Sequence, residues 1–239
     1  MTGPSLHAGA PPTAASQDRI AGAPISVNRI LTGYDATHAE VLVLSAVSGL
    51  DGHDTRPTLD DEDWRRLLEN LDRIASVASE HGVRAVLHPH VGTMVESGAE
   101  VLRVLEGSSV ALCLDTGHLL IGGTDPAELT RQSPDRIAHT HLKDVDSTIA
   151  ERVRDGRLTY TEAVVQGMYR PLGTGDVDIA AIVSTLRSNG YEGWYTLEQD
   201  TILTEEPRGE GPVHDVRISA DLVRGLLATS SAPVRQPGS

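Results

Sequence analysis

The sequence predicts an α/β protein of the (β/α)8-barrel type, in an incomplete form with about six βα units. Three observations support this prediction. Short apolar segments alternate with longer amphipathic ones, polar residues fall at the carboxyl ends of four strands, and no glycine-rich nucleotide-binding fingerprint follows any strand. The last observation argues against a doubly wound sheet, which would gather its ligands in a single crevice.

Six segments have the short, apolar and β-branched composition of strands. Strands that are almost continuously apolar, each followed by a helix, are typical of a parallel sheet with helical crossovers. We expect these strands at residues 19–27, 39–46, 84–90, 110–115, 136–142 and 193–198.

The clearest helix is expected at residues 60–81. Acidic residues suit its first turn, an apolar stripe that includes Trp64 and Leu71 runs along one side, and Gly82 ends it. Further helices are expected at residues 98–105, 126–131, 179–189 and 213–227.

The folded domain is expected at residues 19–228, between tails at 1–18 and 229–239 whose composition is typical of disorder. A complete barrel needs eight βα units, so about two units of the amino-terminal half are missing. Residues 28–38 are where we expect an abnormal strand order, because they leave little room for a crossover helix. A partner subunit in a homo-oligomer is one way to cover the resulting open edge.

Composition narrows the class of partner. The chain has 239 residues and a formal net charge of −14, which argues against nucleic acid or an anionic membrane as partner. It contains no apolar run of membrane-spanning length and no signal-peptide pattern, and its single Cys113 excludes an internal disulfide framework. These features favour the cytoplasm. Cys113 itself is interpreted as a core residue.

Lys143 is the only lysine, and every other basic side chain of the Lys/Arg type is arginine. It lies two residues after His141, at the end of a predicted strand. A buried lysine is able to give up its proton near neutral pH, whereas an arginine is not. Its position therefore indicates a role in chemistry, although an accident of composition is the alternative.

Imidazole and carboxylate groups fall at the carboxyl ends of four consecutive predicted strands. In a barrel these ends meet at one mouth. Mixed nitrogen and oxygen ligands suit a borderline divalent ion such as Mn²⁺, Co²⁺, Fe²⁺ or Zn²⁺, so the pattern predicts a metal site. The candidate residues are His88, His90, Asp115, His139, His141 and Glu198.

Several segments together resemble the inosose dehydratases of myo-inositol catabolism, within the xylose-isomerase-like barrel superfamily. The resemblance extends over about residues 19–227 and is most specific after Val83. LDTGH and the glutamate that ends the last strand are shared across the superfamily, whereas the paired histidines, HLKDV and EQD are more specific. The segments are LHPHVGTMVE, LCLDTGHLLIGGTDP, RIAHTHLKDV, YRPLGTGDVD and GYEGWYTLEQD.

The resemblance implies metal ligation by Asp115, His141 and Glu198, with Mn²⁺ or Co²⁺ as the favoured ion. A fourth ligand comes from His88 or from His90, and the choice between them stays open. Side chains near these ligands could contact substrate hydroxyls or orient the imidazoles. The candidates for such contacts are His90, Glu96, Gln199 and Asp200.

The resemblance also implies a reaction, the dehydration of 2-keto-myo-inositol, a cyclic polyol ketone, to a trihydroxycyclohexane dione. A divalent ion would polarise the ketone and stabilise the enediolate, a base would remove the α-proton, and an acid would protonate the departing β-hydroxyl. Lys143 and His118 are the candidates for base and acid, in either order. The alternatives are a sugar or inosose isomerase or epimerase, which expels no water, and a degenerate polyol-binding protein.

Two further segments could border the substrate. Residues 159–169, which include Tyr160 and Tyr169, could form a loop over the polyol, although solvated surface is the alternative. The glycine-rich loop 171–176 is consistent with a plain turn before the next helix, or with an edge of the mouth.

Overall fold

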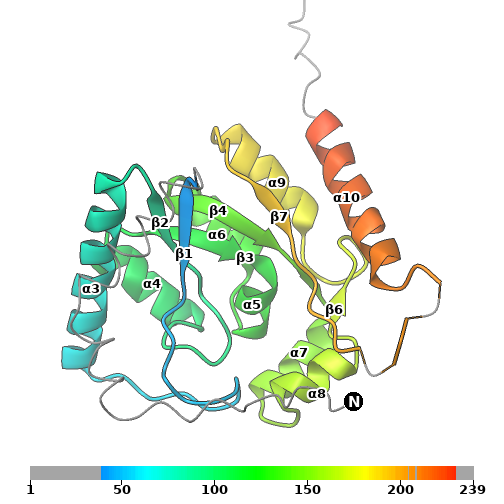
Figure 1. The fold of residues 1–239 in the computed structure, drawn as a ribbon, viewed down its shortest axis with the longest axis horizontal. Coiled ribbons are helices and arrows are strands. Elements are labelled where there is room, and N and C mark those ends of the chain that lie inside the picture. Colours follow the sequence, from blue (N-terminus) through cyan, green and yellow to red (C-terminus); the bar gives the residue numbers. More distant parts are fainter. Residues whose placement is uncertain (1–38, 204, 208, 230–239) are drawn as a thin grey trace, which may run out of the picture.

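A parallel five-stranded sheet forms the centre of the protein (Figure 1). A computed structural model describes residues 39–203, 205–207 and 209–229. The strand order β1-β2-β3-β4-β7 confirms an incomplete barrel, because β1 and β7 are the edges of this sheet in the described part of the chain. The five strands are β1 (Val41–Leu44), β2 (Arg84–Leu87), β3 (Ala111–Asp115), β4 (Ile137–Leu142) and β7 (Tyr195–Leu197).

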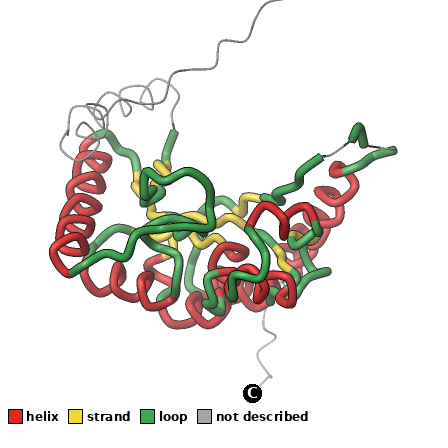
Figure 2. Tube along the Cα trace, turned by 90° about the horizontal axis from the view of Figure 1, so that it is seen from below, coloured by secondary structure: helices red, strands yellow, loops and turns green. Residues whose placement is uncertain are grey.

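The helices gather along one face of the sheet (Figure 2). Within the described residues no helix is both long and apolar enough to cross a membrane. The helices are α3 (Asp61–Glu80), α4 (Gly98–Gly107), α5 (Thr116–Ile121), α6 (Pro126–Gln132), α7 (Ser147–Arg154), α8 (Tyr160–Val165), α9 (Ile179–Ser188) and α10 (Pro212–Thr229), with a 3-10 turn at Pro134–Arg136.

Five of the six predicted strands and all five predicted helices are present in the described residues. The strand expected at 19–27, the junction at 28–38 and the tail at 1–18 lie outside those residues, as do residues 230–239. The sequence patterns missed α5, α7 and α8, which have six to eight residues; the similarly short α6 was predicted because Asp125 and Pro126 mark its start. They also missed a small antiparallel pair of strands, β5 (Asp144–Val145) and β6 (Tyr169–Arg170).

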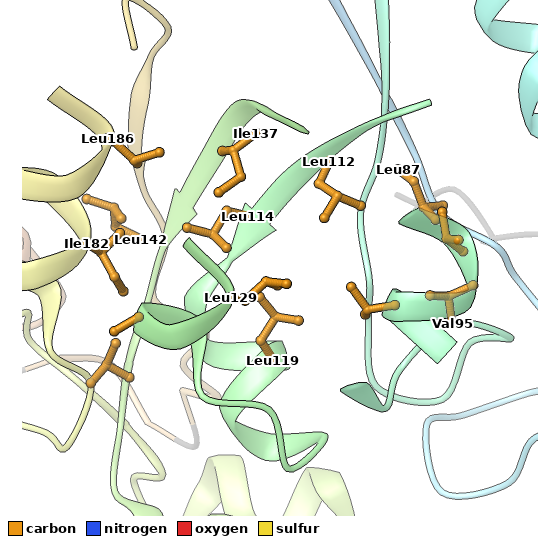
Figure 3. Packing of buried hydrophobic residues seen from close by; sticks show 14 of the residues in the cluster. Leu87, Val95, Leu112, Leu114, Leu119, Leu129, Ile137, Leu142, Ile182 and Leu186 are labelled. Carbon is orange, nitrogen blue, oxygen red and sulfur yellow. The ribbon is translucent and has the colours of Figure 1, made fainter. Parts of the chain in front are cut away.

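Alternation along β3 separates the core from the polar interior. Leu112 and Leu114 are fully buried and join a cluster that includes Leu129 of α6 and Leu186 of α9 (Figure 3). Successive side chains of a strand point to opposite faces, so Cys113 and the residues two positions before and after it face the inner side of the sheet. Because Asp115 lies two positions after Cys113, its side chain also faces the inner side of the sheet.

A buried carboxylate holds the glycine-rich loop in place. Asp144 accepts hydrogen bonds from four backbone amides, those of Val145 (2.9 Å), Gly173 (2.8 Å), Gly175 (3.0 Å) and Val177 (3.0 Å). A Cβ at Gly175 would clash with an Asp144 carboxylate oxygen, so this position requires glycine. The loop at 171–176 is therefore anchored to the segment that follows β4.

Replacing Asp144 by alanine is expected to lower the free energy of unfolding by about 3 kcal/mol or more, because several buried amides lose their acceptor together. The matched control is Asp178→Ala, which removes one amide contact, to Ala181 (2.9 Å), at the exposed start of α9 and should cost about 1 kcal/mol. Urea unfolding followed by circular dichroism measures both. If Asp144→Ala lowers the free energy of unfolding by no more than Asp178→Ala does, Asp144 does not anchor the glycine-rich loop.

The Glu100 carboxylate should make stability depend on pH. Burial would raise the pKa of Glu100, but the amides of Ser97 and Glu96 and the Arg56 guanidinium outweigh burial and hold it below its ordinary value of 4.5. A lowered folded-state pKa stabilises the fold above about pH 4.5 and loses that contribution as pH falls.

The Glu100→Gln variant should accordingly be less stable than the native chain near neutral pH, and the difference should shrink toward about pH 3, where Glu100 is protonated. Thermal unfolding of both proteins across this range tests the expectation. A stability difference that stays constant with pH would contradict it.

Candidate active site

The carboxyl ends of four strands bring polar side chains together on the inner side of the sheet. His88 follows β2, Asp115 ends β3, His141 lies on β4 and Glu198 follows β7. Parallel pairing aligns these ends, since Asp115 lies opposite His141 in the register of β3 and β4. The predicted convergence at one mouth is therefore present for these four residues.

The four side chains form a chain of close contacts. His88 Nε2 lies 3.1 Å and His141 Nδ1 lies 3.6 Å from Asp115 Oδ2, and the same His141 nitrogen lies 3.0 Å from Glu198 Oε2. One ligand atom from each of His88, Asp115 and His141 lies within 4.8 Å of the others. Ligands about 2.1 Å from a divalent ion are separated by about 3.0 to 3.4 Å, so only small adjustments would let these atoms share one ion.

Two buried atoms of this group lack hydrogen bonds. His141 Nδ1 and Glu198 Oε2 lie 3.0 Å apart without the geometry of a hydrogen bond, and within the described residues their other close neighbours, Asp115 and Lys143, meet them as ion pairs only. Buried polar atoms of this kind are costly unless a ligand satisfies them. Both are good donors to a borderline divalent cation, so the residues present fit a metal ion.

Lys143 lies against the same carboxylates. Its side chain is only 2% exposed, and its Nζ lies 3.4 Å from Asp115 Oδ2, 3.3 Å from Glu198 Oε2 and 3.1 Å from Asp200 Oδ2. Nζ also lies 3.0 Å from Nε2 of His118, which is buried at the start of α5. Three carboxylates and one ammonium leave a negative balance here, which a divalent cation would offset.

The backbone around Lys143 explains how a long side chain fits there. A Cβ at Gly117 would lie 2.6 Å from Lys143 Cβ, so the glycine of the LDTGH segment makes room for the lysine. The hydroxyl of Thr116 donates to the Lys143 carbonyl (2.6 Å) and accepts from its amide (2.8 Å). These two bonds fix the lysine backbone against the first turn of α5.

The two proton-transfer candidates have opposite pKa shifts. Burial would lower the pKa of Lys143, but the charges of Asp115, Asp200 and Glu198 outweigh burial and raise it. Burial lowers the pKa of His118 well below its ordinary range, and the neighbouring ammonium adds to this effect. In this arrangement Lys143 is an ammonium ion and His118 is a neutral imidazole.

The metal-ligand candidates are also strongly coupled. Burial would lower the pKa of His141, but the neighbouring Asp115, Cys113 and Glu198 raise it to about 12. The His141 contact lowers the pKa of Glu198 to about 2, with a further contribution from Lys143 and against the effect of burial. Groups that attract a proton to His141 also attract a metal cation to the same position.

His90 lies in the wall of the site and does not contact the carboxylates in the described interactions. Its ring lies against that of His118, with centroids 3.6 Å apart and the planes tilted by 33°, and its Nδ1 donates to the Val91 carbonyl (2.8 Å). His88, in contrast, contacts Asp115 directly. The geometry thus favours His88 over His90 as a ligand, and the ring of His53, 5.4 Å from His90, extends the wall.

Two tyrosines complete the surroundings of Lys143. The hydroxyls of Tyr160 and Tyr169 lie 2.8 Å apart, and Tyr160 also donates to Asp200 Oδ2 at 3.3 Å. Both rings are buried, and Lys143 Nζ lies 5.4 Å from the Tyr169 ring centre. The sequence predicts a loop over the polyol or solvated surface for residues 159–169. The scarcity of aromatic residues, 3% of the chain, is the signal that could have selected these two.

Two residues predicted to contact substrate, Glu96 and Gln199, have their described hydrogen bonds outside the ligand group. Glu96 Oε2 accepts from the Gly92 amide (2.7 Å) and lies 3.5 Å from Arg56. Gln199 donates to Asp215 of α10 (3.2 Å). The described contacts of these two side chains do not join them to the ligand group, so their roles toward substrate stay predictions.

Comparisons with known proteins show the family of this chain. Residues 34–220 match the protein family described as xylose isomerase-like TIM barrel. The inosose dehydratase of Geobacillus thermodenitrificans is 34% identical over 150 residues, which are 62% of this chain and 50% of that protein. The inosose dehydratase of Geobacillus kaustophilus is 39% identical over 145 residues, 59% of this chain and 47% of that protein.

Similar solved structures share the fold at low identity. The structure of the IOLI protein with a bound zinc atom superposes with a TM-score of 0.63 at 14% identity, and covers 92% of this chain and 73% of that one. The chain spans about half the length of the curated relatives it matches. Because the family match extends over most of the sequence, the chain belongs to the xylose-isomerase-like TIM-barrel family.

Proposed function

We propose that this protein is a metal-dependent hydro-lyase that dehydrates 2-keto-myo-inositol to a trihydroxycyclohexane dione. The observation that carries the proposal is the buried pair of Lys143 and His118, 3.0 Å apart and adjacent to the carboxylate and imidazole group. Dehydration needs two proton-transfer groups beside an electrophilic centre. Relatives at 34% and 39% identity carry the name inosose dehydratase, which supports the choice of substrate.

The proposed ligands are His88, Asp115, His141 and Glu198, with Mn²⁺ or Co²⁺ as the ion. Their imidazole and carboxylate atoms converge from four strand ends. A bound divalent ion would polarise the substrate ketone and so acidify the neighbouring C–H bond. The ring of His88 and the buried Asp115 are held by their mutual contact, which fixes these donor groups before substrate binds.

Lys143 and His118 supply the proton transfers. One of them accepts the proton from the carbon next to the ketone, and the other protonates the β-hydroxyl, which leaves as water. The C–H and C–O bonds break, a C=C bond forms, and the enol product rearranges to the dione. Because the two groups are hydrogen-bonded to each other, a proton can pass between them and restore the starting state.

Asp200 and Tyr160 are the proposed substrate-positioning groups. The Asp200 side chain is 40% exposed beside the buried Lys143, so it can accept from a polyol hydroxyl. The Tyr160 hydroxyl, which donates to Asp200, orients this carboxylate. The ring of His90 covers one side of His118 and excludes water from it.

The direct test is incubation of the purified, metal-loaded full chain with scyllo-inosose under anaerobic conditions. The inosose dehydratase of Geobacillus thermodenitrificans serves as the positive control. Loss of water and formation of the dione chromophore support the proposal. An isomeric ketose without water loss would instead show an isomerase or epimerase, and binding without turnover would show a polyol-binding protein.

Asp115→Asn and Asp200→Asn form a matched pair for the metal site. Each removes one carboxylate charge that faces Lys143, but only Asp115 is a proposed ligand. Calorimetric titration with Mn²⁺ should show a loss of affinity of about 100-fold or more in Asp115→Asn, and a change of less than about tenfold in Asp200→Asn. Equal losses in the two variants would show a general charge effect and contradict specific ligation.

Lys143→Arg and His118→Asn should each lower the dehydration rate by about 100-fold or more, because each removes one proton-transfer group. Exchange of the substrate α-proton in deuterated water then assigns the roles. The variant that lost the acid should still exchange this proton, whereas the variant that lost the base should not.

The control for these two variants is His214→Asn, which changes an exposed histidine on α10 and should leave dehydration and exchange unchanged. Undiminished dehydration in Lys143→Arg or in His118→Asn would remove that residue from the mechanism.

A further inference from the structure

A second layer of ligand-type side chains lies directly below the proposed metal ligands. Cys113 of β3 pairs with His139 of β4, and the next pair on the same face of these strands is Asp115 with His141. Alternation along both strands points all four side chains to the inner side of the sheet. The lower layer is thus a thiol and an imidazole beneath a carboxylate and an imidazole.

The two lower side chains, together with His141 above them, lie close enough to one another to hold a metal ion. One ligand atom from each of Cys113, His139 and His141 lies within 4.8 Å of the other two. Cys113 is fully buried, whereas the two histidines are partly exposed. One sulfur and two imidazole nitrogens make a donor set typical of Zn²⁺ and other thiophilic ions, which leave a remaining position for water.

The polar contacts of His139 leave one of its nitrogens unsatisfied. Its Nε2 lies 3.3 Å from the Thr196 hydroxyl, and its Nδ1 is buried without a hydrogen-bond partner among the described residues. Cys113 packs with Val86 and Ala111, so a bare thiolate would be poorly solvated there. A bound cation would both accept the lone pair of a His139 nitrogen and balance the negative charge of a Cys113 thiolate.

We propose that Cys113, His139 and His141 form a second metal site, which takes thiophilic divalent ions such as Zn²⁺, Co²⁺ or Cd²⁺. Binding would replace the thiol proton of Cys113 by the ion and release that proton to solvent. The site is distinct from the upper one in its ligand chemistry, because sulfur replaces the carboxylates. It therefore prefers softer ions than the oxygen-rich upper layer does.

The two sites share His141, which couples them. A neutral imidazole has one lone pair for a metal, so the His141 ring serves one ion at a time. An ion in the lower layer consequently weakens binding in the upper layer, and by linkage the upper ion weakens the lower one to the same extent. Excess zinc or cadmium should act as an inhibitor through this competition.

A cavity lies at the opposite end of the sheet from the upper layer. A cavity of about 470 Å³ opens at the amino ends of the strands, and its lining includes Val41, Ile137 and Ala138, the residue before His139. The upper layer, in contrast, lies at the carboxyl ends.

The test is a titration of the full chain with Co²⁺, followed by absorption spectroscopy. A thiolate-to-cobalt charge-transfer band in the near ultraviolet is expected in the native chain and absent in Cys113→Ser. His139→Asn should weaken the titration of this band by about tenfold or more. The Asp115→Asn variant should still show the band. Its half-maximal intensity should occur at a lower Co²⁺ concentration than in the native chain, because the upper site no longer competes for His141.

Either of two results would overturn the proposal: no charge-transfer band in the native chain at saturating Co²⁺, or an unchanged titration in His139→Asn. The His139→Asn variant keeps the test decisive even if Cys113→Ser fails to fold, and His214→Asn is the surface control. Because absorbance is the readout, the outcome is independent of whether the protein proves to be a dehydratase.

Discussion

Asp115 is a fully buried carboxylate, and the need to compensate its charge organises the site around it. One of its oxygens accepts the amide of His118 at 2.8 Å and so caps α5, where the helix dipole favours a negative group. The other oxygen faces His88, His141 and Lys143. Burial alone would raise the pKa of Asp115, but His118 together with these three neighbours holds it well below its usual range.

The same carboxylate links fold to chemistry. As the cap of α5 it fixes the turn that carries Gly117 and His118, and that turn makes room for Lys143. Removing one partner from such a buried network leaves an uncompensated charge, which costs more than the pair contributes. A divalent ion would join this network on the side where His141 and Glu198 already face each other.

Sequence patterns predicted the strands because each is an apolar run, and they predicted the convergence of Asp115 with His141 because parallel strand ends coincide. They did not choose between His88 and His90, since alternation assigns residues two positions apart to the same face and β2 already ends at Leu87. Nor did they reveal the four amides on Asp144, whose partners lie up to 33 positions away in the chain. Contacts of that kind depend on loop paths that composition does not encode.

Binding of a divalent ion by His88, Asp115, His141 and Glu198 is best tested by anomalous X-ray scattering from crystals grown with Mn²⁺. We expect one anomalous peak within about 2.3 Å of ligand atoms from these residues, with the Lys143 ammonium beside it and not in its place. A peak bonded to neither carboxylate, or no peak while Lys143 still bridges Asp115 and Glu198, would contradict the account.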